Sequence, residues 1–197
     1  GVSIYTMNYT KVYVNVYAVE PSDWAAYKTF LREYARTDNP PNPPGRLVMD
    51  DTINLEAPSD VLTETLIDLS DVMEGDYGHF IMIIKPPKGF FEKERYWEHI
   101  LTWVQVTQIG LDAIVDHSEM VAWATALEDG APLSGITIRS DGDLSVTTGE
   151  DGLARFDIPN TGILYLTATK GKDVALLPRS SYTWSDDVWA SRKVNDT

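Results

Sequence analysis

The chain has 197 residues, of which 43% are hydrophobic and 23% charged, so disordered and collagen-like proteins are excluded. Its net charge of −14 is spread over both halves without a basic stripe, which disfavours nucleic acid and anionic lipid as partners. No cysteine is present, which excludes disulfides, zinc–cysteine sites and thiol catalysis within these residues. The longest apolar runs, such as 80–84, are far shorter than the ~20 residues that span a bilayer. No signal peptide is evident, and the strand-like start suggests a fragment of something longer.

The first half begins with a clear strand and a clear helix. Apolar and polar residues alternate over 11–19, with Val12, Val14 and Val16 on one face, which predicts a half-buried strand. A helix is expected over 23–36, with Ser22 as its N-cap. The apolar face of this helix would hold Trp24, Tyr27, Leu31 and Tyr34.

The rest of the first half is predicted to be mostly strand. The proline-rich stretch 38–45 has to be an exposed loop, because proline lacks the amide hydrogen that helices and central strands need. Residues 90–99 have no clear period and are interpreted as a connection between domains. The predicted strands are 45–49, 53–55, 62–69 and 79–85.

The second half contains eight short apolar segments with turn signals every eight to twelve residues. Several of these turns pair Asp or Asn with Gly, which supplies the backbone geometry of tight hairpins. This spacing is typical of an antiparallel β-sandwich. The predicted strands are 101–108, 113–116, 120–127, 135–139, 144–147, 153–158, 164–169 and 174–177.

The fold expected from these patterns is mainly β, with two antiparallel β-sandwich domains, the first carrying an inserted helix. The first domain covers residues 1–100, including the connecting segment. The second covers residues 101–197 and ends in a linker.

No histidine or carboxylate pattern indicates catalysis or metal binding. His79, His99 and His117 are scattered, and surface or edge positions are expected for His79 and His117. Asp116-His117-Ser118 contains the residue types of a hydrolase triad, but adjacent strand residues point to opposite faces. The acids at 141, 143, 186 and 187 do not follow a calcium-loop pattern and are interpreted as solvated turn residues. The sequence therefore assigns no catalytic, cofactor-binding or metal-binding residue, and no enzyme activity is expected.

Six tryptophans raise the possibility of a sugar-binding platform, but core positions explain most of them. Trp24 lies on the helix face and Trp103 lies in a predicted strand. In the strand 120–127 the larger side chains Val121, Trp123, Thr125 and Leu127 are expected on the core face, which would bury Trp123. Trp184 and Trp189 in the polar tail stay unexplained.

Several segments resemble the bacterial alpha-2-macroglobulins. The more specific ones are Trp103-Val104-Gln105-Val106-Thr107 and Gly171-Lys172-Asp173-Val174-Ala175-Leu176-Leu177-Pro178. The stretches 121–136 and 148–156 fit as well, although their Asp-Gly turns also occur in other bacterial immunoglobulin-like domains. The second half is similar to the third macroglobulin-like domain of that family. The first half, through 9–24 and the turn before His79, is similar to the second.

The resemblance implies two macroglobulin-like sandwiches, of immunoglobulin or fibronectin III type, from a bacterial endopeptidase inhibitor in the periplasm or at the cell surface. Such a protein traps proteases by collapsing when its bait region is cleaved. Many members also carry a Cys-Glu-Gln thioester, which this chain lacks. A structural scaffold role follows. The partners would be neighbouring macroglobulin-like domains of the same chain, and trapped proteases only through the full-length protein. No nucleic acid partner, membrane insertion or cofactor is implied.

Two other classes stay open at this point. An immunoglobulin-like module of a surface adhesin or carbohydrate-binding protein would need an exposed aromatic cluster. A calcium-stabilised stalk repeat would need a cation site among its turn aspartates.

Overall fold

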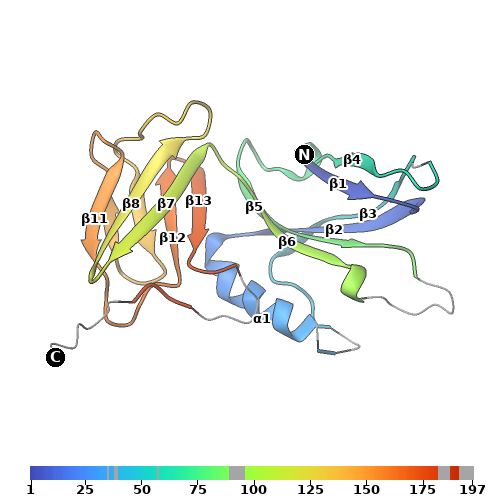
Figure 1. Cartoon of the computed structure of the whole chain (residues 1–197), viewed down its shortest axis with the longest axis horizontal. Coiled ribbons are helices and arrows are strands. Elements are labelled where there is room, and N and C mark those ends of the chain that lie inside the picture. Colours follow the sequence, from blue (N-terminus) through green and yellow to red (C-terminus); the bar gives the residue numbers. More distant parts are fainter. Residues whose placement is uncertain (35, 38–39, 57, 89–95, 182–186, 191–197) are drawn as a thin grey trace. The chain divides into compact units, whose positions relative to one another are not determined.

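The computed structural model describes residues 1–34, 36–37, 40–56, 58–88, 96–181 and 187–190 (Figure 1). The chain divides into two compact units, Gly1–Val104 and Gln105–Thr197. The domain boundary expected from the sequence, between residues 100 and 101, lies four residues before the division between the units, because β6 (Ile100–Val106) begins in the sheet of the first unit. Most of the predicted connection at 90–99 lies outside the described residues, and Tyr96–Glu98 form a short 3-10 helix, η4.

A four-stranded sheet in the order β3-β2-β5-β6 forms the centre of the first unit. Strand β2 (Lys11–Val19) has the predicted bounds, and its valines at 12, 14 and 16 are buried while Tyr13 is exposed. Strand β5 (Gly78–Lys85) carries an apolar run from Phe80 to Ile84 in which every side chain is buried. A strand buried on both faces requires cover on both sides of its sheet.

Helix α1 (Trp24–Tyr34) supplies cover for one side of this sheet (Figure 1). The rings of Trp24 and Tyr27 each lie 5.4 Å from the ring of Trp103 on β6, in edge-on arrangements. Edge-to-face packing of this kind adds about 0.5–1.5 kcal/mol per pair beyond the area that it buries. Of the face predicted for this helix, Trp24, Tyr27 and Tyr34 are buried and Leu31 is only partly so.

The helix begins differently from the prediction. A 3-10 turn, η1 (Pro21–Asp23), precedes α1, and its N-cap is Glu20 rather than Ser22. The Glu20 amide donates to Asp23 Oδ2 at 3.0 Å. Proline is favoured at the first position of a helical turn, which moves the cap to the residue before Pro21.

Strand β3 (Arg46–Asn54) is a single nine-residue edge strand, whereas the sequence predicted two short strands there. Asp50, Asp51 and Thr52, between the two predicted strands, are exposed. They pair with residues 15, 14 and 13 of β2 without a break. An edge strand tolerates such polar residues because its outer side faces water.

A separate antiparallel ribbon of β1 (Val2–Thr6) and β4 (Thr63–Ile67) completes the first unit. Its inward side chains Ile4 and Ile67 are buried. Strand β4 is shorter than the segment 62–69 predicted for it. A 3-10 turn, η2 (Ser70–Val72), follows β4.

The second unit is a sandwich of two sheets, in the orders β11-β8-β7 and β10-β9-β12-β13. Its core lies between them and includes Met120, Ala122, Ile138, Leu166 and Ala168, each with no exposed surface. Seven of the eight strands predicted for the second half are present in it, with ends that differ by a few residues. The predicted strand 101–108 is instead β6, which joins the sheet of the first unit. The bounds of the seven strands are β7 Ile109–Asp116, β8 Glu119–Ala126, β9 Thr137–Ser140, β10 Ser145–Thr147, β11 Leu153–Asp157, β12 Tyr165–Lys170 and β13 Asp173–Pro178.

The set of β8 side chains that lies in the core is the opposite of the predicted set. Met120, Ala122 and Ala124 are fully buried, whereas Trp123 is only partly buried and Leu127 is 61% exposed. Small side chains on β8 leave room for Ile136, Ile138 and Phe156 in the same core. The placement of Trp123 in the core was therefore wrong.

Turn glycines allow the loops to approach β8 closely. Gly152, which has a φ of +75°, accepts a hydrogen bond from the Ala124 amide at 2.9 Å. A Cβ atom at position 152 would lie 2.7 Å from the Ala124 carbonyl oxygen, so a larger residue would force the two segments apart. The Asp151-Gly152 turn predicted from the sequence is thus confirmed.

The segment that enters the second unit is tied to β13, an edge strand. Gln105 accepts from the Leu176 amide at 2.8 Å and donates to the Leu176 carbonyl at 3.3 Å. The buried carboxylate of Asp173 accepts from Thr107 Oγ1 at 2.6 Å and from the Gln108 amide at 3.0 Å. These contacts satisfy polar groups along an edge that would otherwise be open to another strand.

Candidate functional site

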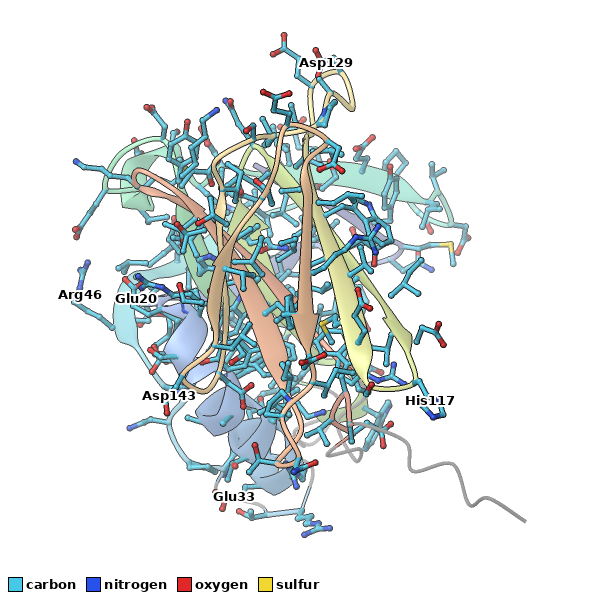
Figure 2. The ribbon with its side chains drawn as sticks, turned by 90° about the vertical axis from the view of Figure 1, so that its left-hand side faces the viewer. Glu20, Glu33, Arg46, His117, Asp129 and Asp143 are labelled. Atoms are coloured by element: carbon cyan, nitrogen blue, oxygen red, sulfur yellow. The ribbon has the colours of Figure 1, made fainter. Side chains whose placement is uncertain are left out.

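The three histidines lie in different environments and share no site. His79 is 6% exposed, so the prediction of a surface or edge histidine was wrong for it. It is the second residue of β5, which is buried on both faces, and its Nδ1 lies 3.2 Å from Trp103 Nε1, which donates to it. Half-buried His99 lies 2.7 Å from the Tyr34 hydroxyl. His117 is exposed and points outward from the β7–β8 turn (Figure 2).

The aromatic residues of the first unit form a packed cluster, not an open platform. Trp24, Tyr27, Trp103 and His79 contact one another around α1, β5 and β6. Burial raises the pKa of Tyr27 to about 12. This cluster accounts for Trp24 and Trp103 as structural residues.

The carboxylates singled out in the sequence form no cation site among the described residues. No group of three or more His, Cys, Asp and Glu side chains in the described ranges could hold a metal ion. Asp141 accepts from the Leu164 amide at 2.9 Å, which is a loop contact. Asp143 and Asp187 are exposed, and residue 186 lies outside the described residues.

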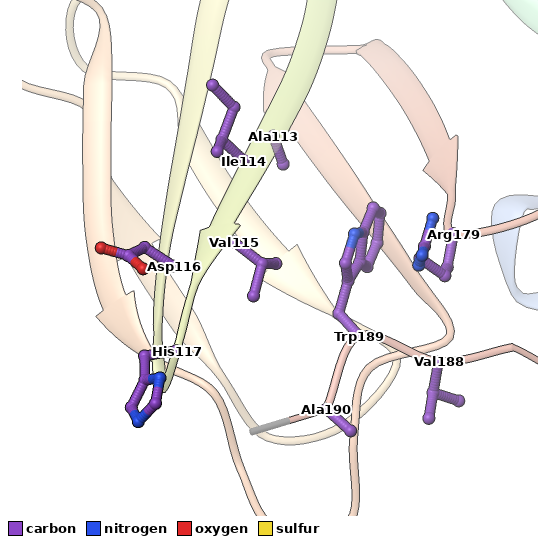
Figure 3. A pocket seen from close by; sticks show the side chains of 9 residues that line it. All are labelled: Ala113, Ile114, Val115, Asp116, His117, Arg179, Val188, Trp189 and Ala190. Atoms are coloured by element: carbon purple, nitrogen blue, oxygen red, sulfur yellow. The ribbon is translucent and has the colours of Figure 1, made fainter. Parts of the chain in front are cut away.

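An open hollow of about 680 Å³ lies at one end of the second unit (Figure 3). Residues 113–117 form one wall, and Arg179 and the stretch 188–190 form the other. Trp189 pairs with Ile163 through two backbone hydrogen bonds of 2.8 Å, and its side chain packs against the core. Asp116 and His117 point apart in Figure 3, so the triad-like sequence does not assemble there. Trp189 thus has a structural role, while Trp184 lies outside the described residues.

The outer face of the β11-β8-β7 sheet is the first of two exposed apolar surfaces. The residues on the side of the sheet away from the core are Gly110, Asp112, Ile114, Asp116, Glu119, Val121, Trp123, Thr125, Leu127, Leu153, Arg155 and Asp157, here called the outer face. Ile114 is 60% exposed and Leu127 is 61% exposed. Trp123 lies between Asp112 on β7 and Leu153 on β11.

Gly110 is the reason that Leu127 lies against this sheet. A Cβ atom at position 110 would lie 3.1 Å from Leu127 Cδ2 and 2.8 Å from Thr125 Oγ1. The side chains of Thr125 on β8 and of Leu127, which follows β8, therefore lie close to the space that the missing side chain leaves on β7.

The second apolar surface is on the ribbon of the first unit. It consists of the exposed side chains Tyr5, Met7, Val61, Leu62 and Leu66. The end of the ribbon is fixed by two hydrogen bonds, from Asn8 Nδ2 to Asp60 Oδ1 at 3.0 Å and from the Asp60 amide to Asn8 Oδ1 at 2.7 Å. Asn8 and Asp60 both have positive φ angles, a conformation that non-glycine residues adopt at a cost.

No helix in the described part of the chain is long and apolar enough to cross a membrane. No protein-family model matches the sequence, and no curated protein matches it.

Solved structures of bacterial alpha-2-macroglobulins do match the fold. The native Escherichia coli protein spanning domains NIE-MG1 has a TM-score of 0.67 at 19% identity, covering 91% of this chain and 88% of that one. A longer E. coli structure, spanning MG0-NIE-MG1, has a TM-score of 0.60 at 18% identity, with 90% of this chain and 58% of that chain covered. A Salmonella alpha-2-macroglobulin has a TM-score of 0.57 at 20% identity over 90% of this chain.

These matches confirm the predicted antiparallel, mainly β architecture. They also confirm the predicted likeness of the fold to bacterial alpha-2-macroglobulin domains. The first of these E. coli structures spans domains NIE-MG1, whereas the sequence resemblance pointed to the second and third macroglobulin-like domains. The chain spans only 10% of the Salmonella chain and 13% of the trypsin-activated E. coli chain.

Proposed function

We propose that this chain is a structural scaffold segment of a bacterial alpha-2-macroglobulin-like protease trap. The observation that carries the proposal is that one pair of E. coli alpha-2-macroglobulin domains matches both units together, over 91% of this chain. A chance likeness between common β-sandwiches would more readily match one unit alone. The family-like segments at 103–107 and 171–178 support the same origin.

The proposed role is positional, not chemical. The sequence contains no cysteine, so these residues cannot form a thioester. In the first unit the residue types that catalysis uses are engaged in packing, as His79 is with Trp103. The partners are neighbouring macroglobulin-like domains of the same chain, and the location is extracytoplasmic, in the periplasm or at the bacterial surface.

Incubation with trypsin tests the scaffold role of residues 1–197. We expect trypsin activity on a large protein substrate and on a small chromogenic peptide to stay unchanged at a tenfold molar excess of the chain. Stoichiometric inhibition of either activity would contradict a passive scaffold. The parent gene gives a second test, because a chain of well over a thousand residues is expected around this segment.

One observation favours a carbohydrate-binding or adhesin module as an alternative. Trp123 lies on the outer face with Asp112 beside it, and aromatic rings flanked by polar groups can stack on sugars. Screening residues 1–197 against a glycan array would support this alternative if a bound glycan quenches tryptophan fluorescence and Trp123→Ala abolishes the effect.

A further inference from the structure

The charged residues of the outer face are unevenly arranged. Asp116, Glu119 and Asp157 are register partners on three adjacent strands, so three carboxylates form one row across the sheet. Like charges directly opposite one another destabilise a sheet. The row lies at the end of the sheet that carries the exposed His117 turn (Figure 2).

The negative charge of this carboxylate row is only weakly balanced by basic side chains of the second unit. Arg155, the single basic side chain on the outer face of the described strands, lies 3.7 Å from Glu119, and both side chains are more than half exposed. Among the described residues, Asp116 and Asp157 have no ion-pair partner. A fourth carboxylate, Asp112, stands beside Trp123.

The apolar part of the outer face lies at a fixed distance from the carboxylate row. Trp123 follows Glu119 by four positions along β8, which is about 13 Å at the usual rise of a strand. Ile114 and Val121 lie between them, as neighbours in register. The outer face therefore offers an anionic end and an apolar end about 13 Å apart.

We propose that the outer face binds a cationic segment of another polypeptide, in which a lysine or arginine stands four residues from a large apolar side chain. An extended segment places alternate side chains on one side, so residues i and i+4 would reach Glu119 and Trp123 together. A basic segment neutralises the carboxylate row, whereas nucleic acids and anionic lipids would be repelled by it. The proposal is independent of whether the chain belongs to a protease trap.

The test uses residues 1–197, labelled with ¹⁵N, and the synthetic peptide Thr-Lys-Thr-Lys-Thr-Phe-Thr-Leu-Thr. We expect amide shifts in β7, β8 and β11, concentrated around Trp123 and Glu119, and weaker binding as salt is raised. A peptide with glutamate in place of lysine should not bind. Shifts confined to other strands, or equal binding of the two peptides, would overturn the proposal.

Two matched triple variants show which carboxylates bind the lysine peptide. The variant Asp116→Asn, Glu119→Gln, Asp157→Asn should bind the lysine peptide at least about tenfold more weakly, as for loss of complementary charge at an interface. The control Glu33→Gln, Asp143→Asn, Glu150→Gln removes the same net charge at exposed positions off the outer face, and its affinity should stay within about twofold of wild type. Equal loss in both variants would mean that only the overall negative charge attracts the peptide and would overturn the proposal.

The triple charge variant removes like-charge contacts, so it should fold, which far-UV circular dichroism checks. Trp123→Ala then tests the apolar end, because it leaves the three carboxylates unchanged. Weaker binding of the lysine peptide to this variant supports the proposal. If Trp123→Ala binds the peptide as wild type does, while a glycan shifts the same amides, the face is a sugar platform and the proposal is wrong.

Discussion

Trp123 of β8 lies directly opposite Leu153 of β11, with both side chains on the solvent side of the sheet and small Ala122 and Ala124 turned into the core. This arrangement places the largest side chain of the strand outside the sandwich. It separates the residues that stabilise the second unit from those that are available to a partner.

Replacing Trp123 by alanine should therefore cost little stability. We expect Trp123→Ala to lower the free energy of unfolding by about 1 kcal/mol, because its neighbours are partly solvated. Met120→Ala, which leaves a cavity in the core, should cost about 2–5 kcal/mol. Urea denaturation followed by circular dichroism compares the two. A larger loss for Trp123→Ala than for Met120→Ala would contradict the observed direction of β8.

Asp173 should be important for the integrity of the second unit. Its buried carboxylate accepts hydrogen bonds from Thr107 and Gln108, so Asp173→Ala leaves two donors without an acceptor. We expect a loss of about 1–3 kcal/mol. Asp143→Asn, at an exposed turn, is the control and should have no measurable effect. If thermal unfolding gives the same midpoint for both variants, the tie between residues 107–108 and β13 is not stabilising.

Tyr27 should make the first unit sensitive to alkali. Burial raises its pKa from 10.0 to about 12, so the unfolded chain loses this proton first as pH rises. The associated stability is fully present below pH 10 and is lost between about pH 10 and pH 12. Tyr27→Phe should narrow the difference in unfolding free energy between pH 9 and pH 11.5. An identical pH dependence for Tyr27→Phe and wild type would show that Tyr27 does not contribute.

Calcium should not affect thermal stability. No cluster of three potential ligands is present among the described residues, and Asp141 is engaged with the Leu164 amide. We expect the same unfolding midpoint in 5 mM calcium and in excess chelator. A rise of several degrees with calcium would instead favour the stalk-repeat interpretation.

The sequence predicted strands well where composition alone decides their faces. In β2 one set consists of three valines and Ala18, and the other set is largely polar or tyrosine, so its buried face followed directly. In β8 both sets are apolar, and periodicity states that residues alternate without saying which set faces inward. That choice depends on Ile136, Ile138 and Phe156, which fill the core and leave room only for small side chains on β8.

The sequence analysis also missed the outer face, because a local pattern does not show which strands become neighbours. Its carboxylate row is made by residues 116, 119 and 157, which become neighbours only through the register of three strands. His79 was misjudged because its position at a strand end suggested exposure, while Trp103, 24 residues later, supplies its cover. The carboxylate row and the burial of His79 both depend on contacts between segments that are distant in the sequence, which local patterns do not show.

The most direct test of the proposed function uses the natural full-length protein that contains this segment. It is incubated with trypsin, and residual activity is measured on a large protein substrate and on a small chromogenic peptide. A scaffolded trap predicts that activity on the large substrate falls steeply while activity on the small peptide persists. Undiminished activity on both substrates, or equal loss of both, would contradict the protease-trap account.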